Sequence, residues 1–373
     1  MSRPPSRRRD DYDNRQSNRT RPDKRREADE LVGTAINDLG GAFQAALAEI
    51  GDWLGLYAAL ADAGPFTSTE LAEHTDTHER YVREWLRSQA AGGYVTYDPE
   101  TDRYSLSPEQ RLVLANEESP TFMLGGFQGT NAIIAEVQDD IEAAFQTGDG
   151  VGWHEHHPEL FSATERFYKP GYAASLISEW IPTLDGMETK LENGARVADV
   201  GCGYGATTIL MAEAYPESTF VGIDYHDHSI DMARERAEEA GIAERVSFEA
   251  ATAKSYNGAE YDLVTMFDCF HDMGDPVGVA AHVRETLADD GTWMLVEPFA
   301  NDQVEDNLNP VGRVFYAFST MICTPNSLDQ GGNPALGAQA GAARLREVAT
   351  EGGFTRFRRA TETPVNLVLE VKP

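Results

Sequence analysis

The sequence predicts an α/β protein whose C-terminal half forms a doubly wound, mostly parallel sheet, preceded by a smaller helical domain. Two observations carry this prediction. From Gly194 onward, short apolar runs alternate with segments of helical periodicity, which is typical of a parallel sheet with helices on both faces. The first of these runs leads into a glycine-rich turn, VGCGYGATT. In open α/β sheets, such a turn binds a ligand at the start of the next helix.

We expect seven strands in this sheet. The first five are short apolar runs separated by helical segments; they span 196–200, 219–223, 246–250, 261–267 and 292–297. The helices between and after them are expected at 206–215, 228–240 and 278–288. Only a short turn containing Pro364 separates the last two strands, 354–361 and 366–371, so they are expected to close the sheet as an antiparallel pair.

Residues 29–115 predict a winged helix. Apolar residues recur at helical spacing over 31–60, and Thr67-x-x-Glu70 is a capping box that opens a short helix. A further helix starts at Asp76 and stops at a Gly-Gly pair, and a hairpin signal follows. The order helix, helix, helix, hairpin is that of a winged helix. Residues 116–190 are expected to be a mostly helical linker before the sheet domain, which would span 191–373.

The charge of the chain is strongly negative and unevenly distributed. The net charge is −31; residues 1–27 carry +5 and the remainder −36. An acidic, lysine-poor surface stays hydrated where salt screens its self-repulsion, which indicates a halophile's cytoplasm. An acidic surface for a basic partner is the alternative. Residues 1–28 are almost free of apolar side chains and are expected to be a disordered tail, with a nucleic-acid-binding arm as the alternative.

Targeting signals and cysteines favour the cytoplasm. No apolar run is long enough to span a membrane, and the arginine-rich N-terminus lacks a secretory apolar segment. The three cysteines, Cys202, Cys269 and Cys323, are far apart and odd in number. They therefore predict neither a disulfide framework nor a zinc site, and a reducing compartment fits them best.

Two strand ends predict a nucleoside cofactor. The glycine turn brings backbone close to a ligand at a helix start, and Asp224 ends the second strand about twenty residues later. An acid in that place can accept both ribose hydroxyls. Gly201, Gly203 and Ala206 also fit the dinucleotide fingerprint, so this pair of features leaves S-adenosylmethionine and NAD both open.

The loop FDCFHDMGDP follows the fourth strand and is expected to face the same crevice. His271 in this loop is the candidate general base, since an imidazole can remove a proton near neutral pH. Glu297, at the end of the fifth strand, could orient that imidazole. The alternative is a histidine that only holds the loop or packs against the cofactor.

Other candidates carry less weight. His154-Glu-His-His157 invites a metal hypothesis, but adjacent residues seldom converge on one ion, so no metal is predicted. Cys202 and Cys323 have no activating neighbour in the sequence, which disfavours a nucleophilic cysteine. Four side chains on a helix-like stretch could form either an aromatic pocket wall or ordinary core. They are Phe315, Tyr316, Phe318 and Met321.

With these residues in hand, the chain resembles class I S-adenosylmethionine-dependent methyltransferases with an N-terminal winged helix. It is most similar to a group of bacterial and archaeal methyltransferases, some of which were labelled transcriptional regulators. The likeness runs from about Gly51 to the C-terminus. The segments that carry it are VADVGCGYGATTILMAEAYP, FVGIDYHDHSIDMARERA, YDLVTMFDCFHDMGDP, GTWMLVEP, NLNPVGRVFYAFSTMICTPNSL and ALGAQAG. The fold that it implies is a seven-stranded, Rossmann-like methyltransferase sheet.

The resemblance assigns site residues and implies S-adenosyl-L-methionine as the cofactor. The methionine portion would be held by Asp199, Gly201, Cys202, Gly203 and Gly205. Asp224 and Tyr225 would bind the ribose, Thr252 replaces the usual adenine-side acid, and Asp268 would line the pocket. A wider likeness to small-molecule O-methyltransferases matches their catalytic His-Asp pair to His271-Asp272. It also implies that the winged helix dimerises and that the helices of 116–190 cover the substrate.

The function expected is therefore methyl transfer to an unknown small-molecule acceptor, with oxygen as the favoured atom. The alternative is a transcriptional regulator that senses S-adenosylmethionine, based on Arg80, Arg83 and Arg87 in the presumed recognition helix. Residues 51–115 are acidic overall, which opposes phosphate contacts. An NAD-dependent oxidoreductase is a third interpretation. The apolar first helix predicts a homodimer, and neither nucleic acid nor membrane is expected as a partner.

Overall fold

The computed structural model describes residues 21–136, 141–331 and 335–373. It divides into two compact units, Met1–Ser107 and Pro108–Pro373. The domain boundaries expected after residues 28, 115 and 190 stay predictions. None of the helices in the described residues has the length and apolar character needed to cross a bilayer.

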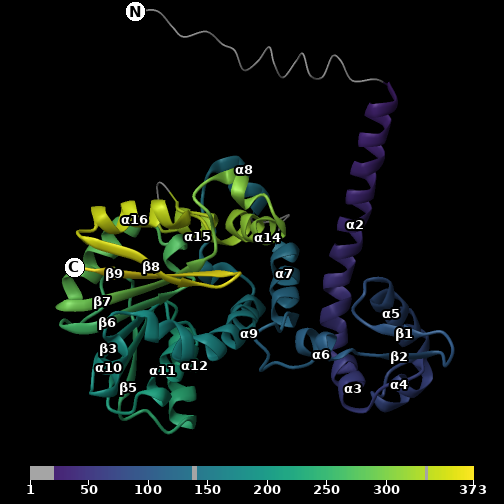
Figure 1. The fold of residues 1–373 in the computed structure, drawn as a ribbon, viewed down its shortest axis with the longest axis horizontal. Helices are drawn as coiled ribbons and strands as arrows, with labels where there is room; N and C mark the ends of the chain where they lie inside the picture. Colours follow the sequence, from purple (N-terminus) through teal and green to yellow (C-terminus); the bar gives the residue numbers. More distant parts are fainter. Residues whose placement is uncertain (1–20, 137–140, 332–334) are drawn as a thin grey trace, which may run out of the picture. The chain divides into compact units, whose positions relative to one another are not determined.

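Unit 1 is built from helices α2 (Arg21–Trp53), α3 (Leu56–Ala63), α4 (Ser68–His74) and α5 (Glu79–Ala91), followed by the antiparallel hairpin of β1 (Thr96–Asp98) and β2 (Arg103–Ser105) (Figure 1). This order confirms the winged helix. The capping box is present: Thr67 Oγ1 accepts from the Glu70 backbone N–H at 3.2 Å, and Glu70 Oε2 accepts from the Thr67 N–H at 2.8 Å.

Helix α2 starts earlier than the sequence analysis expected. The predicted disordered tail covers residues 1–28, and its first twenty residues lie outside the described part. Residues 21–28 are helical, as the first turns of α2. Arg26 pairs with Glu30 one turn later, at 3.6 Å. Such i,i+4 pairs stabilise a helix without any apolar periodicity, so the apolar pattern alone places the start of this helix too late.

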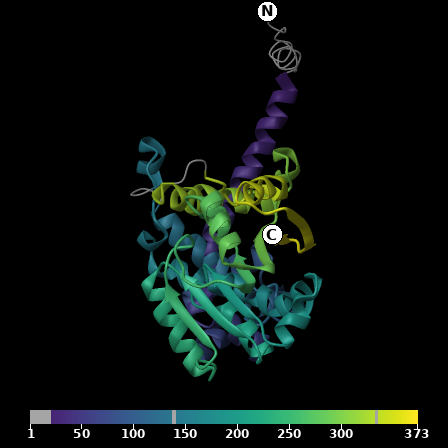
Figure 2. The same cartoon turned by 90° about the vertical axis from the view of Figure 1, so that its left-hand side faces the viewer.

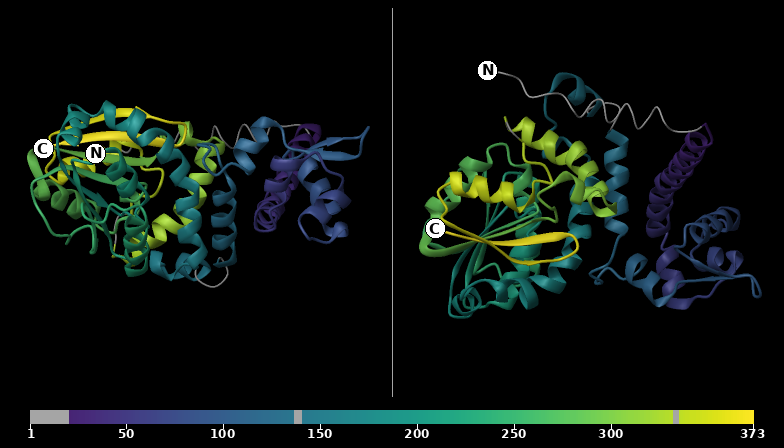
Figure 3. Two further views of the ribbon diagram at one scale, coloured as in Figure 1. Left: turned by 90° about the horizontal axis from the view of Figure 1, so that it is seen from below. Right: turned by 45° about the horizontal axis from the view of Figure 1, so that its top comes forward.

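Unit 2 contains the predicted seven-stranded sheet. Its strands are β3 (Arg196–Val200), β4 (Thr219–Asp224), β5 (Val246–Ala250), β6 (Tyr261–Phe267), β7 (Leu287–Pro298), β8 (Arg356–Glu362) and β9 (Asn366–Lys372). Their order across the sheet is β5-β4-β3-β6-β7-β9-β8. The first five strands are parallel, and β9 runs antiparallel to both of its neighbours. Figure 3 shows the β8–β9 hairpin in yellow beside β7.

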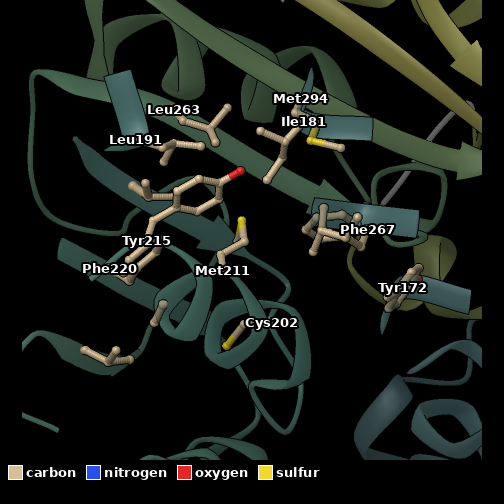
Figure 4. Packing of buried hydrophobic residues seen from close by; sticks show 14 of the residues in the cluster. Tyr172, Ile181, Leu191, Cys202, Met211, Tyr215, Phe220, Leu263, Phe267 and Met294 are labelled. Carbon is tan, nitrogen blue, oxygen red and sulfur yellow. The ribbon is translucent and has the colours of Figure 1, made fainter. Parts of the chain in front are cut away.

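Helices cover both faces of this sheet (Figure 2). One face packs against α10 (Met187–Glu192), α11 (Ala206–Ala214) and α12 (Asp227–Glu239). The other packs against α13 (Pro276–Thr286) and α16 (Gly341–Glu351). Strand side chains alternate between the two cores: Val197 lies in the first and Ala198 in the second. Figure 4 shows the first core, where Met211, Tyr215 and Leu263 interlock.

The remaining helices of unit 2 lie before β3, between β6 and α13, and between β7 and α16; the one after β6 is η5 (Phe270–Asp272). Those before β3 are α6 (Pro108–Leu114), α7 (Leu124–Glu136), α8 (Glu142–Thr147), η2 (Trp153–Glu155), α9 (Pro158–Ser175), η3 (Leu176–Trp180) and η4 (Ile181–Thr183). Those after β7 are η6 (Val304–Asn307), α14 (Pro310–Phe318), η7 (Ser319–Cys323) and α15 (Thr324–Asp329). Helices α7 and α9 pack closely, since a Cβ at Gly125 would lie 2.7 Å from the Phe167 backbone nitrogen.

Candidate active site

A cavity of about 520 Å³ lies in unit 2 at the carboxyl ends of the parallel strands. Residues that end or follow β3, β4, β5, β6 and β7 all contribute to its lining. Helices α7, α9 and α14 complete the wall. In an open α/β sheet, ligands bind at this edge, because the loops after parallel strands meet there.

The glycine turn connects β3 to α11 and forms one end of the cavity. Its three glycines all have positive φ values, with 77° at Gly201. A Cβ at Gly201 would lie 2.5 Å from Cys269 Sγ, so a larger residue there would be strained and would clash. Gly201, Cys202 and Gly203 line the cavity, whereas Gly205 starts α11 and packs against Phe248.

The Asp199 side chain is buried behind the glycine turn and does not line the cavity. It is 1% exposed, and its carboxylate accepts hydrogen bonds from Thr207 and Thr208 at 2.7 and 2.6 Å and from Thr265 at 2.8 Å. Burial raises its pKa, although the three hydroxyls oppose that shift. The carboxylate therefore fastens the start of α11 to β3 and β6. A direct contact with a cofactor amine stays a prediction.

Asp224 ends β4 and reaches back to the glycine turn. Its carboxylate accepts the Gly203 N–H at 3.0 Å and the His226 N–H at 2.9 Å. Burial raises its pKa, and these backbone donors lower it. Asp224 and Tyr225 both line the cavity, as the ribose prediction requires. The Tyr225 side chain is 40% exposed, so it forms part of the cavity rim.

Thr252 and Asp268 line the cavity from the loops after β5 and β6. The Thr252 hydroxyl shares a hydrogen bond with Ser255 Oγ at 2.7 Å. Asp268 is held in the left-handed region at φ 50°, a strained conformation that other residues must stabilise.

Two residues that the sequence analysis did not name hold the Asp268 carboxylate. Tyr172, on α9, donates its hydroxyl to Oδ2, and the Asn366 amide donates to both oxygens at 2.9 Å. Burial raises the pKa of Asp268 to about 7, and the Tyr172 hydrogen bond opposes this shift. Tyr172 and Asn366 are separated from Asp268 by 96 and 98 residues, so no local pattern could have paired them.

His271 and Glu297 are brought together where β6 and β7 end. His271 Nδ1 lies 2.8 Å from Glu297 Oε2, and Oε1 of the same carboxylate accepts the Phe270 N–H at 3.0 Å. Both side chains are at most 5% exposed. His271 lines the cavity, while Glu297 lies behind it. Their catalytic roles stay predictions.

The pKa of His271 reflects two opposing effects. Burial lowers it, but the Glu297 carboxylate and Cys323 together raise it well above its ordinary value. The imidazole therefore binds a proton more tightly than a free histidine would. Asp272, next in the chain, also lines the cavity, and burial raises its pKa to about 6.

Cys323, which the sequence disfavoured as a reactive residue, lines the cavity. Its Sγ lies 3.3 Å from His271 Nε2, so the expectation that this cysteine has no activating neighbour was wrong. Cys323 ends the π-helical turn η7 and lies 52 residues from His271. Only the packing of η7 against the loop after β6 brings the two together.

The predicted aromatic wall is present in part. Phe315 and Phe318 line the cavity from α14, together with Phe161 and Tyr168 from α9. Met321 packs instead in a small core with Ile133 and Leu160. The stretch therefore serves as both wall and core.

The histidine cluster at 154–157 has structural roles. His156 Nδ1 lies 2.6 Å from Glu136 Oε2, and His157 caps the start of α9 by accepting the Glu159 N–H. Across the residues described, no group of three or more His, Cys, Asp or Glu side chains is arranged to hold a metal ion.

The arginines of the presumed recognition helix α5 are paired within that helix. Arg80 and Arg87 both contact Glu84, at 2.6 and 3.3 Å, and Arg83 contacts Glu79 at 2.8 Å. These glutamates neutralise the positive charge that phosphate contacts would need. The helix therefore offers no observation in favour of nucleic-acid binding.

The sheet order, the antiparallel β9 and the glycine turn after β3 define the fold of class I methyltransferases. Comparison with known families agrees with this class. Residues 191–327 match the model of a methyltransferase domain, and residues 42–116 match that of an Rv2258c-like winged helix-turn-helix domain. The chain thus combines a methyltransferase domain with a winged helix-turn-helix domain.

Individual relatives are similar over parts of the chain or in fold alone. The ubiquinone biosynthesis O-methyltransferase of Bordetella avium is 32% identical over 135 residues, which cover 35% of this chain and 52% of that protein. The chain therefore spans about half the length of this curated relative. Mitomycin 7-O-methyltransferase has a similar structure, with a TM-score of 0.69 at 18% identity, covering 93% of this chain and 99% of that one. Human N-acetylserotonin methyltransferase, solved with S-adenosylmethionine, is also similar in structure, with a TM-score of 0.65 at 17% sequence identity. The similarity covers 92% of this chain and 97% of that one.

Proposed function

We propose that this chain is an S-adenosylmethionine-dependent methyltransferase that methylates an oxygen atom of a small, apolar or aromatic acceptor. One observation carries the proposal. A single cavity is lined by the glycine turn and Asp224 and also by His271 and an aromatic wall. A cofactor on the first group of residues and an acceptor on the second would meet inside unit 2.

The cavity lining fits a cationic nucleoside. Carboxylates from several elements line it; they are Glu165, Asp224, Asp268, Asp272, Asp275 and Asp329. Bound S-adenosylmethionine would supply an electrophilic methyl group on a positively charged sulfur. We assign Asp224 and Tyr225 to the ribose, Gly201, Cys202 and Gly203 to the methionine portion, and Thr252 to the adenine side. Asp199 and Gly205 would act by holding the turn in shape.

The chain's own residues would contribute positioning and proton transfer. Phe315 and Phe318 would hold an apolar acceptor so that its reacting atom lies in line with the methyl group. The same two side chains would exclude water from the reacting atoms. In its neutral form His271 would take the acceptor's proton at Nε2, and Glu297 would fix the imidazole through Nδ1 and stabilise the imidazolium that forms. The relatives named above are methyltransferases, two of them named for O-methylation, which supports oxygen as the acceptor atom.

Calorimetry tests the cofactor assignment. We expect S-adenosylhomocysteine to bind and NAD to give no heat. Asp224→Ala should weaken binding by about tenfold or more, because it removes the acceptor for the ribose hydroxyls. The exposed neighbour Asp227, at the start of α12, provides the matched control as Asp227→Ala. Tight NAD binding without S-adenosylhomocysteine binding would show that the cavity serves an oxidoreductase.

We also propose that α2 pairs with α2 of a second copy to form a homodimer. Exposed apolar side chains follow a four-three spacing along this helix; they are Val32, Ile36, Leu39, Phe43, Ala46 and Ile50. Leu39 and Phe43 are 63% and 71% exposed. This spacing is that of a coiled-coil seam, which buries its apolar stripe against another helix.

Sedimentation tests the dimer. Replacing Leu39 and Phe43 together by Asp should convert a dimer into a monomer, because two charges would then lie in the seam. Phe145→Asp is the matched control, since Phe145 is 73% exposed on α8 of the other unit. A wild-type monomer at working concentration would refute the pairing.

We further propose that the protein works in a cytoplasm of high ionic strength, such as that of a halophile. Its net charge of −31 supports this proposal, because salt would screen the repulsion among its acids.

A further inference from the structure

Glu297, His271 and Cys323 form a continuous row of contacts at one end of the cavity. The carboxylate holds Nδ1 of the imidazole at 2.8 Å, and Nε2 lies 3.3 Å from the Cys323 sulfur. This is the arrangement of a nucleophile, a base and a group that orients the base. Methyl transfer as proposed above uses the imidazole but gives the thiol no role.

The other two cysteines lack this arrangement although they line the same cavity. Cys202 is as buried as Cys323, at 7% exposure, and its Sγ lies 3.7 Å from the Gly203 carbonyl oxygen. Cys269 is less buried, and its Sγ lies 3.4 Å from the Val200 carbonyl oxygen. Burial raises the pKa of both thiols well above the ordinary range. A carbonyl oxygen cannot accept and keep a proton, whereas an imidazole can.

We propose that Cys323 is a covalent modification site, a thiol activated by His271 that reacts with small, soft electrophiles entering the cavity. The class includes alkyl halides, maleimides and conjugated enones. With iodoacetamide, the Sγ–C bond forms as the C–I bond breaks, and iodide leaves. The thiol proton passes to His271 Nε2 and from there to solvent. The Glu297 carboxylate, 2.8 Å from Nδ1, stabilises the protonated imidazole that this transfer leaves.

An adduct on Cys323 would occupy the acceptor end of the cavity. Phe315 packs in the same small core as Cys323, and both residues line the cavity. The adduct would also remove the contact with His271 Nε2. We therefore expect modification of this thiol to stop methyl transfer, an expectation that rests on the proposed function.

Alkylation of the intact protein without cofactor or acceptor tests the reactivity. Tryptic peptides are quantified by mass spectrometry after timed exposure to iodoacetamide at neutral pH. We expect Cys323 to react about tenfold or more faster than Cys202, its control of equal burial. His271→Ala should lower the Cys323 rate to that of Cys202. Equal rates for the two cysteines in the wild type, or a Cys323 rate unaffected by His271→Ala, would overturn the proposal.

Glu297→Gln keeps the test decisive if His271→Ala fails to fold. The amide oxygen can still accept the Phe270 N–H, but the negative charge beside the imidazole is lost. We expect this variant to slow alkylation of Cys323 several-fold while Cys202 is unaffected. A wild-type rate in this variant would contradict the assigned role of the row of contacts.

The consequence for methyl transfer is measured separately. Iodoacetamide should inactivate the wild type in step with labelling of Cys323, and Cys323→Ser should resist inactivation. Full activity with Cys323 completely labelled would refute the predicted block. Because the labelling rates require no turnover, failure of the proposed function would leave the reactivity result intact.

Discussion

His271 shows how much the meaning of one residue depends on its partners. Its position in the loop after β6 made it the candidate base, but the structure adds that both ring nitrogens already have neighbours. Nδ1 is fixed by Glu297, and Nε2 faces a thiol. An acceptor hydroxyl that gives its proton to Nε2 must therefore lie beside Cys323 or displace it.

We expect His271→Ala to lower kcat by about 10² to 10⁴ while the affinity for S-adenosylhomocysteine changes little. The reason is that the proposal assigns the imidazole to the acceptor and Asp224 to the ribose of the cofactor. Steady-state kinetics measures kcat, and calorimetry on the same samples measures the affinity for S-adenosylhomocysteine. His228→Ala, at an exposed position on α12, controls for loss of a histidine. Unchanged turnover would remove His271 as the base.

Asp268 predicts a pH dependence of stability. Burial raises its pKa from 3.8 to about 7, so between these values the folded chain binds more protons than the unfolded chain. The free energy of unfolding therefore falls as pH rises through this window, by at most about 4 kcal/mol from this group. Asp268→Asn should give a flatter pH dependence in urea unfolding. Asp227→Asn, at an exposed position, should keep the wild-type slope. If the free energy of unfolding had the same pH dependence in the wild type and in Asp268→Asn, the raised pKa of Asp268 would be contradicted.

At the scale of elements, short-range patterns were the most informative. The first four parallel strands, the capping box of α4 and the hairpin at the end of the chain lie close to where the sequence predicts them. Each depends on residues a few positions apart. The fifth parallel strand, β7, starts at Leu287, five residues earlier than expected, where the preceding helix was predicted to continue. The start of α2 was predicted too late because a charged pair, Arg26–Glu30, accompanies its first turns, where apolar periodicity is absent.

The capping box gives an element-scale prediction. Thr67→Ala should destabilise unit 1 by about 1 kcal/mol, because the Glu70 N–H loses its acceptor. Thr69→Ala is the matched control: Thr69 is exposed in the same helix and forms no part of the box. Thermal unfolding of both variants measures the difference. An equal effect of the two substitutions would show that the cap contributes nothing.

At the scale of the whole molecule, the dominant property is charge. A net charge of −31 on 373 residues produces repulsion that water alone screens poorly. The carboxylates that line the cavity lie within the negative electrostatic potential that this net charge produces. A cationic cofactor would be attracted to the cavity both by its lining and by the protein as a whole.

We expect the melting temperature to rise by about 5 °C or more between dilute buffer and molar KCl. Sucrose is the control, because it stabilises proteins by being excluded from their surface and does not screen charge. A rise in melting temperature due to screening should appear with KCl and exceed the rise that sucrose produces. Replacing Glu235, Glu238 and Glu239, exposed on α12, by Gln should reduce the salt dependence. A melting temperature that is independent of salt would refute adaptation to high ionic strength.

The sequence by itself determined the sheet, its two-sided helical cover and the loops that carry Asp224 and His271. These follow from periodicity and from the rule that parallel strands present their carboxyl ends at one edge. Only the tertiary structure decided which distant side chains meet at that edge. It brought Tyr172 and Asn366 to Asp268, and it brought Cys323 to His271. The reason is that these contacts depend on how α9, β9 and η7 pack, and no local pattern records the packing of segments so far apart in the chain.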